Sequence, residues 1–172
     1  MTSQPTSKPE HRVGTVAAVC LRPDGGVPKY PQDEVTIGEY GIEGDWHSGP
    51  MRTRSNGEVV PNTRHVSLVA KEVFDDLNRE LGTEIPPGGF GENVLVEGMG
   101  DLSAIREGDL LRFSSGVELE VTGQNDPCRN VMVYHNQVPK RAYGRRGVLA
   151  IVRATGRVRP GDTVTLGSDT AR

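Results

Sequence analysis

Cys128 is the residue whose type and setting are best suited to chemistry. It follows Pro127, which suits the first position of a helix, and it precedes Arg129. A helix N-terminus and a neighbouring cation both favour the thiolate, the nucleophilic and metal-binding form of cysteine. The polar flanking residues favour a reactive or ligand-binding thiol. The alternative is the inert buried thiol that is commoner for a lone cysteine, and this is what we expect for Cys20, which stands among valine, alanine and leucine residues.

Two glycine-rich loops, at residues 41–49 and 86–94, carry further polar side chains. These are Asp45, His47, Glu92 and Asn93. Glycine lets the backbone approach a ligand and present its amides to an anion, and an asparagine at the mouth of a strand can hydrogen-bond a ligand. Each loop also has a structural alternative: a solvated hairpin loop for the first, and for the second a loop capped by Asn93 itself.

Positive charge is concentrated in the last part of the chain. The 172 residues include 20 basic and 23 acidic side chains, for a net charge of −3, which argues against a nonspecific nucleic-acid binder. Residues 124–172 nevertheless hold nine basic and only three acidic side chains. Arg129, Arg145 and Arg146 belong to this basic part, which predicts an electropositive site for an anionic ligand such as a phosphate. A solvated charged face is the simpler alternative.

Many short strands must position these residues. The chain contains 22 glycines and 12 prolines, which predicts many turns. Strand-like segments bounded by turn residues occur at 13–20, 35–37, 58–60, 64–69, 94–96, 110–113, 117–122, 148–153 and 163–166. The segment at 117–122 has valine or leucine at every second position, as in one wall of a barrel or sandwich. The whole pattern predicts a mainly-β barrel.

Helical periodicity is clear in one segment. Its apolar residues are Ala70, Val73, Phe74, Leu77 and Leu81. Charged residues cover the opposite face, and Gly82 suits the end of the helix. A second, short helix is expected from Pro127 to about His135.

Length and composition predict one domain of ordinary size, at 13–168, between polar tails at 1–12 and 169–172. The chain has no apolar run of the roughly 20 residues that span a membrane, and its first residues lack the apolar core of a secretory signal. We therefore expect a cytoplasmic protein with no membrane or nucleic-acid partner. Two distant cysteines support neither a disulfide framework nor a structural zinc site.

Six motifs follow one another in an order that resembles the MOSC domain, a family named for the C-terminal domain of molybdenum cofactor sulfurase. They are Gly44-Asp45-x-His47 with Gly49, Arg64-x-Val66-Ser67-Leu68, Gly88-x-Phe90-Gly91-Glu92-Asn93, Val121-Thr122-Gly123 leading to Pro127-Cys128, Gly147-Val148, and Gly156-x-Val158-x-x-Gly161-Asp162. The resemblance covers Val13 to Leu166. It implies a stand-alone member of the family, with a closed mixed β-barrel of the MOSC or pyruvate-kinase-barrel-like type and one or two short helices.

The resemblance also implies a chemistry, because members of the family handle sulfur for the molybdenum-pterin cofactor or bind that cofactor. Cys128 matches the family's catalytic cysteine, which takes up sulfur or lies next to the metal and binds it. The implied cofactor-binding residues are Asp45, His47, Arg64, Glu92, Asn93, Arg129, Arg145 and Arg146. The arginines would bind the phosphate of the pterin, and His47 and Asn93 would orient the ligand.

The activity stays open between a molybdenum-dependent oxidoreductase that reduces N-hydroxylated compounds and a sulfurtransferase-like sulfur carrier. A non-catalytic module that binds an anionic ligand or a partner protein is the alternative. The implied partners are a cysteine desulfurase or a molybdoenzyme. Family descriptions mention pyridoxal phosphate, but we do not expect it here, because the chain is too short for the aminotransferase-like domain that precedes the MOSC domain in the sulfurases.

Two departures from the family pattern stand out. Trp46 occupies the place of the arginine that many relatives have in Gly-Asp-Arg-His, which removes a positive charge from that loop and with it a contact to phosphate. Cys128 has no second cysteine nearby. A persulfide on Cys128 would therefore need an external thiol to resolve it.

Overall fold

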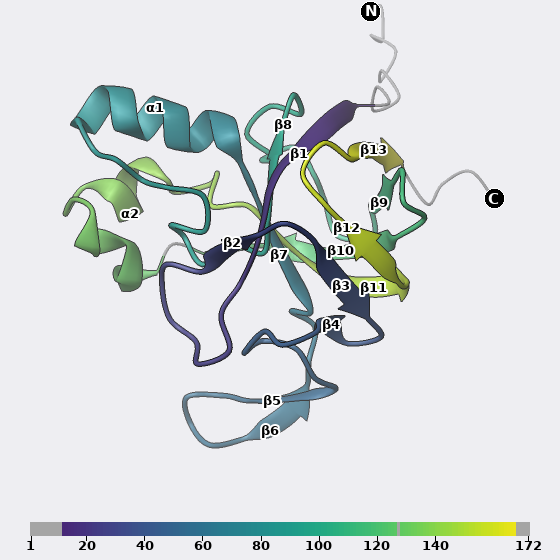
Figure 1. The fold of residues 1–172 in the computed structure, drawn as a ribbon. Helices are drawn as coiled ribbons and strands as arrows, with labels where there is room; N and C mark the ends of the chain where they lie inside the picture. Colours follow the sequence, from purple (N-terminus) through teal and green to yellow (C-terminus); the bar gives the residue numbers. More distant parts are fainter. Residues whose placement is uncertain (1–11, 127, 168–172) are drawn as a thin grey trace, which may run out of the picture.

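Seven strands close into a barrel in the computed structural model, which describes residues 12–126 and 128–167 (Figure 1). The tails expected at 1–12 and 169–172 lie outside these ranges except for Arg12, and so does Pro127. The barrel strands are β1 (Val13–Leu21), β7 (Val66–Ala70), β8 (Val94–Glu97), β9 (Leu110–Phe113), β10 (Glu118–Gln124), β11 (Val148–Ala154) and β13 (Thr163–Gly167). Their order is β13-β9-β10-β11-β7-β8-β1, and pairing of β13 with β1 closes the ring. The closed barrel expected from the sequence is confirmed.

The barrel is mixed, because β7 and β8 run parallel while the other neighbouring strands of the ring are antiparallel. A parallel pair needs a crossover, and helix α1 (Lys71–Leu81) supplies it. Val73, Phe74 and Leu77 of α1 are buried, and Gly82 ends the helix with a left-handed φ of 65°. The predicted helix is thus confirmed. Within the described ranges, no helix is long and apolar enough to cross a membrane.

The interior of the barrel follows the alternation seen in the sequence. Leu119 and Val121 of β10 are buried, whereas Glu118 and Glu120 are half-buried on the other face. The predicted wall segment is confirmed. Cys20 in β1 is fully buried in the core, as expected.

In the described part of the chain, six short strands lie outside the seven-stranded ring. They are β2 (Tyr30–Gln32), β3 (Val35–Gly38), β4 (Gly41–Ile42), β5 (Met51–Thr53), β6 (Val59–Pro61) and β12 (Gly156–Val158). β2 pairs with β1, β12-β3-β4 form a small sheet, and β5 and β6 form a hairpin that projects from the barrel (Figure 1). The sequence pattern missed β2, β4, β5 and β12, since strands of two or three residues are too short to show alternation.

The segment around Cys128 differs from the helix expected from Pro127 to His135. A 3-10 helix spans Arg129–Val133, and α2 (Val138–Arg141), which was not predicted, follows it. Cys128 has an extended backbone, with φ −112° and ψ 147°, and precedes the 3-10 helix. The expectation that Cys128 lies in the first turn of a helix is therefore wrong. A five-residue 3-10 helix also has little dipole to stabilise a thiolate.

Candidate functional site

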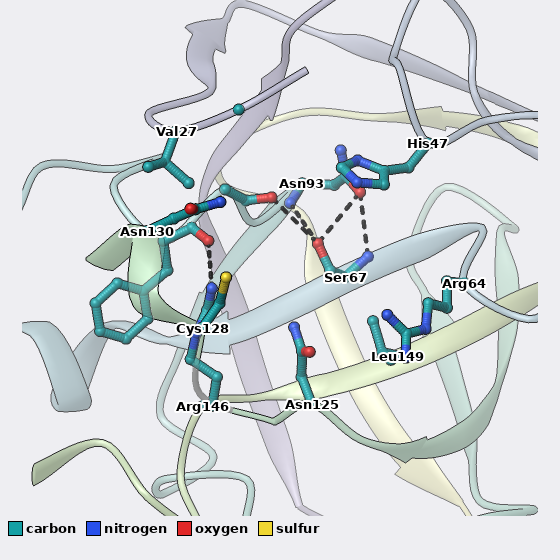
Figure 2. Close-up of a pocket in the computed structure, with 13 residues that line it drawn as sticks. Val27, His47, Arg64, Ser67, Asn93, Asn125, Cys128, Asn130, Arg146 and Leu149 are labelled. Atoms are coloured by element: carbon teal, nitrogen blue, oxygen red, sulfur yellow. Dashed lines mark hydrogen bonds between the residues drawn. The ribbon is translucent and has the colours of Figure 1, made fainter. Parts of the chain in front are cut away.

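One pocket brings together five of the residues expected at the site. They are His47, Arg64, Asn93, Cys128 and Arg146 (Figure 2). They come from five separate places in the chain: the loop after β4, the residues before β7, the residue before β8, the residue before the 3-10 helix, and the turn before β11. The barrel strands thus gather side chains that are up to 99 residues apart around a cavity of about 220 Å³.

Cys128 is exposed at this pocket, and Arg146 lies in the wall beside it (Figure 2). Arg146 is 5% exposed, its Nη2 donates a 2.6 Å hydrogen bond to the backbone oxygen of Phe90, and its guanidinium lies over the Phe90 ring. Its buried Nε has no hydrogen-bond partner among the described residues. Burial lowers the pKa of Arg146, and the charges of Glu92 and Cys128 act in the opposite direction. Arginine stays protonated in proteins, so the wall holds a buried cation suited to an anionic ligand.

The amide of Asn93 is engaged by the barrel itself. Its Oδ1 accepts hydrogen bonds from the backbone N–H of Ser67 at 3.1 Å and from the Ser67 hydroxyl at 3.4 Å (Figure 2). Its Nδ2 donates to the backbone oxygen of Cys20 at 3.2 Å. Asn93 therefore links β7 to β1 from its place just before β8. This is a structural task, but it differs from the capping alternative, because the partners of the side chain lie on β7 and β1 and not in the loop of Asn93 itself. Orientation of a ligand by Asn93 stays a prediction.

A buried ion pair between Lys29 and Asp45 lies next to His47. Lys29 donates from Nζ to Asp45 Oδ2 at 2.8 Å, and both side chains are 1% exposed. Asp45 also accepts the backbone N–H groups of Arg22 and His47. Burial raises the pKa of Asp45, but its hydrogen bonds and the charge of Lys29 outweigh burial and hold that pKa well below its usual range. Asp45 is therefore an anion that shapes the loop, and it does not line the pocket.

The same ion pair fixes the imidazole of His47. Lys29 Nζ lies 3.1 Å from His47 Nδ1. A lysine ammonium only donates hydrogen bonds, so when Lys29 is protonated Nδ1 accepts, and a neutral ring then carries its hydrogen on Nε2. Burial lowers the pKa of Lys29, whereas the charge of Asp45 raises it. The sequence pattern missed Lys29, because nothing in the run Val27-Pro-Lys-Tyr30 signals burial of a lysine.

Glu92 lies behind the pocket wall rather than on it. Its side chain is fully buried, and its carboxylate accepts the backbone N–H groups of Gly88 and Phe90, each at 3.1 Å. Burial raises the pKa of Glu92 to about 7, against the effect of these hydrogen bonds. Glu92 thus holds the glycine-rich loop in shape, which places Phe90 against Arg146.

Two of the expected arginines do not line the pocket. Arg145 points to α1, where its Nη1 lies 3.2 Å from Asp76 Oδ2, and its Nε donates to the backbone oxygen of Arg141. Arg129 is exposed outside the lining residues. Position in the sequence therefore does not decide which arginines line the pocket: Arg145 and Arg146 are neighbours in the chain, yet only Arg146 reaches the pocket.

The pocket also contains polar residues to which sequence analysis gave no role. They are Ser67, Asn125 and Asn130. Asn125 and Asn130 flank Cys128 at three and two positions, and this spacing was the only signal that could have found them. Among the described residues, no group of three or more His, Cys, Asp or Glu side chains could hold a metal ion. A metal at this pocket would have to bring most of its own ligands.

Comparison with known proteins gives a family match. A family model described as the MOSC domain matches residues 43–165. YuaD from Bacillus subtilis (strain 168), whose description provisionally assigns it to metal-sulfur cluster biosynthesis, is 33% identical over 157 residues, which are 79% of this chain and 81% of YuaD.

Solved structures show the same fold. The crystal structure of YuaD matches with a TM-score of 0.83 and 26% identity, over 92% of this chain and 98% of YuaD. The crystal structure of YiiM from Geobacillus stearothermophilus matches with a TM-score of 0.64 and 18% identity, over 92% of this chain and 75% of that chain. At this identity, the likeness to YiiM concerns the fold alone.

Proposed function

Because the chain belongs to the MOSC domain family, we propose that Cys128 accepts sulfur in a pocket that binds an anionic ligand. One observation carries this proposal: the exposed Cys128 shares its pocket with Arg64 and Arg146, and no described lining residue is a carboxylate. The motif order had identified the family correctly. The family is linked to the molybdenum cofactor and YuaD's description to metal-sulfur clusters, and both concern sulfur that must be transferred to a metal centre.

The proposed step is a thiol exchange. The thiolate sulfur of Cys128 attacks the outer sulfur of a persulfide on a donor protein such as a cysteine desulfurase. A bond forms between Cys128 Sγ and the outer sulfur, the sulfur–sulfur bond of the donor breaks, and the donor cysteine leaves as a thiolate with the electron pair of that bond. The resulting anionic persulfide lies beside the buried guanidinium of Arg146. No separate oxidant is needed.

Cys20 does not take part in this exchange. Its side chain is fully buried, and burial, together with the charge of Glu92, raises the pKa of its thiol to about 12. The outer sulfur therefore leaves Cys128 by attack of a thiol from outside the chain, in a second exchange of the same kind. This agrees with the lack of a second cysteine near Cys128 in the sequence.

Binding of the molybdenum-pterin cofactor is the second candidate, favoured by the combination of one soft thiol with two arginines in one pocket. Arg64 and Arg146 would hold its phosphate, His47 would donate from Nε2, and Cys128 would add one ligand to a metal that brings its others. A bound cofactor would supply the redox chemistry that reduction of N-hydroxylated compounds requires. The cavity of about 220 Å³ is smaller than the roughly 300–1,000 Å³ of pockets that enclose ligands, so part of the cofactor would lie outside it.

Mass spectrometry and metal analysis distinguish these functions. The wild type, Cys128→Ser and, as the matched control, Cys20→Ala are purified from cells that make the cofactor and incubated with a cysteine desulfurase and cysteine. The proposal expects the mass of one added sulfur atom on the wild type and on Cys20→Ala but not on Cys128→Ser. Stoichiometric molybdenum and pterin fluorescence that Cys128→Ser loses, without added sulfur, would establish the second candidate. If the wild type carries neither added sulfur nor molybdenum, both proposals are rejected and the protein is a non-catalytic binding module.

A further inference from the structure

A second cavity adjoins the Cys128 pocket. It is a groove of about 440 Å³ between the loop that carries Trp46 and the hairpin of β5 and β6. His47 and Arg64 line both the groove and the Cys128 pocket, so the two cavities meet at these side chains. A ligand that lies in the groove can therefore extend to Cys128.

Trp46 forms one wall of the groove as a largely open aromatic surface. The residue is 63% exposed, although a tryptophan normally buries most of its ring. The backbone of Gly25 packs against its indole: a Cβ on Gly25 would lie 3.1 Å from the indole Cγ and Cδ1. Gly25 has a φ of +72°, which favours glycine, and its missing side chain permits this approach. The indole is thus supported by Gly25 and presents its remaining surface to the groove.

The opposite wall is apolar and exposed. Met51 pairs with Pro61 and Thr53 with Val59 across the hairpin, which places Met51, Thr53 and Val59 on one face. Met51 and Val59 are large exposed hydrophobic residues of the described chain, and both line the groove. The flexible thioether of Met51 suits contact with an aromatic ring. A flat apolar group would therefore find partners on both walls.

Two arginines give the groove a positive charge. Arg52 and Arg64 line it, whereas no carboxylate occurs among its described lining residues. The Nε of Arg52 is buried and has no hydrogen-bond partner among the described residues. A groove with two arginines and no carboxylate among its described lining residues is complementary to an anion.

We propose that this groove binds the aromatic ring of an aryl compound that carries an anionic group. The ring lies between Trp46 and the apolar face of the hairpin, and the anionic group lies at Arg64, where the groove meets the Cys128 pocket. The inference rests on the proposed function in that the anionic group of the ligand then lies at the pocket in which Cys128 accepts sulfur. On this proposal, Trp46, which stands where many relatives have an arginine, decides that the groove prefers ligands with an aromatic ring.

Two phosphate esters of equal charge test the aromatic preference. Phenyl phosphate and cyclohexyl phosphate have six-carbon rings and differ in planarity and aromaticity. Isothermal titration calorimetry should show phenyl phosphate binding roughly two- to tenfold more tightly, since aromatic pairs gain this much beyond area burial. Trp46 is the only tryptophan in the sequence, so its fluorescence should respond to saturation by phenyl phosphate.

Variants assign the preference to Trp46. Trp46→Leu should bind both esters equally, and Trp46→Phe should retain the preference for phenyl phosphate. Tyr143→Leu is the matched control, because Tyr143 is an exposed aromatic residue outside both cavities. Arg64→Gln should weaken the binding of both esters. Thermal unfolding of each variant verifies its fold.

The proposal is overturned if phenyl phosphate binds no more tightly than cyclohexyl phosphate, if neither binds, or if Trp46→Leu keeps the preference. Sulfur transfer to Cys128 is measured in parallel by intact mass. An aryl preference without any sulfur on Cys128 would reject the proposed function and leave the groove assignment standing. Sulfur on Cys128 without an aryl preference would reject the groove assignment alone.

Discussion

The guanidinium of Arg146 lies 4.5 Å from the centre of the Phe90 ring and donates a hydrogen bond to the backbone oxygen of the same residue. One loop residue thus holds the arginine by its ring and by its backbone. Glu92 accepts the backbone N–H of Phe90 and so keeps this loop in place. The glycine-rich loop therefore lines the pocket itself and also positions a cation that comes from another part of the chain.

Replacement of Arg146 should slow sulfur transfer to Cys128. Arg146→Gln removes the cation beside the persulfide, and hydrogen bonds to charged groups contribute about 1.5–3 kcal/mol, so we expect persulfide formation to slow roughly 10- to 100-fold. Arg146→Lys, which keeps the charge, should recover part of the rate. Intact-mass time courses with a cysteine desulfurase measure the effect.

Arg145→Gln provides the control for that experiment, because it makes the same change of charge one residue away. Arg145 binds Asp76 outside the pocket, so its replacement should leave the rate of sulfur transfer unchanged. An equal loss of rate in both variants would show that Arg146 acts only through the overall charge of the segment.

Lys29→Met should destabilise the protein strongly. The change leaves the carboxylate of Asp45 buried and without its cation, and breaking a buried pair in this way costs about 3–5 kcal/mol. Urea unfolding monitored by circular dichroism measures the loss. Arg54→Met, which breaks the exposed pair with Glu58, is the matched control and should cost less than about 1 kcal/mol. A similar, small cost for both variants would contradict the structural role of Lys29.

Local pattern was enough to predict the barrel and the main helix. The alternation through Leu119 and Val121 and the helical spacing through Val73 and Leu77 each record which side faces the core. Such periodicity is a local property, so it can be seen without tertiary information. β4, with two residues, is held by its pairing with β3 and leaves no period to detect.

Five of the residues named from the sequence line one pocket, and their role as a site stays a prediction. The positions of His47 and Asn93 follow from the loops that carry them, and the family motifs include both. Lys29 could not be found, because its burial depends on an ion pair with a residue 16 positions away. Nor could sequence separate Arg145 from Arg146, since their opposite directions are set by α1 and by Phe90.

Glu92 should make stability fall as the pH rises between about 4.5 and 7. Its pKa is raised by burial from 4.5 to about 7, so the folded state binds a proton that the unfolded state has lost in this interval. Its contribution to stability is complete below pH 4.5 and is lost as the pH rises through the folded-state pKa. Between these two limits of pH, the contribution of Glu92 to the free energy of unfolding changes by about 3 kcal/mol.

The free energy of unfolding in urea, measured from pH 4 to 8 for the wild type and for Glu92→Gln, tests this effect. His65 has a pKa lowered by burial and contributes the opposite slope near its ordinary value, but it is present in both proteins and cancels in the comparison. The wild type should lose stability relative to Glu92→Gln as the pH rises. Parallel curves would mean that Glu92 ionises in the folded protein as it does in the unfolded chain.

The two thiols should differ in their reaction with iodoacetamide. Cys128 is exposed, so it should be alkylated in the native protein, whereas Cys20 is fully buried with a thiol pKa raised to about 12 and should react only after unfolding. Peptide mass spectrometry after native and denatured labelling assigns the modified residue. Phenyl phosphate at saturation should slow the alkylation of Cys128, because the proposed ligand position at Arg64 lies in the same pocket. Native labelling of Cys20 at the rate of Cys128 would contradict the burial of β1 in the barrel, and alkylation of Cys128 at an unchanged rate would place the phosphate away from the thiol.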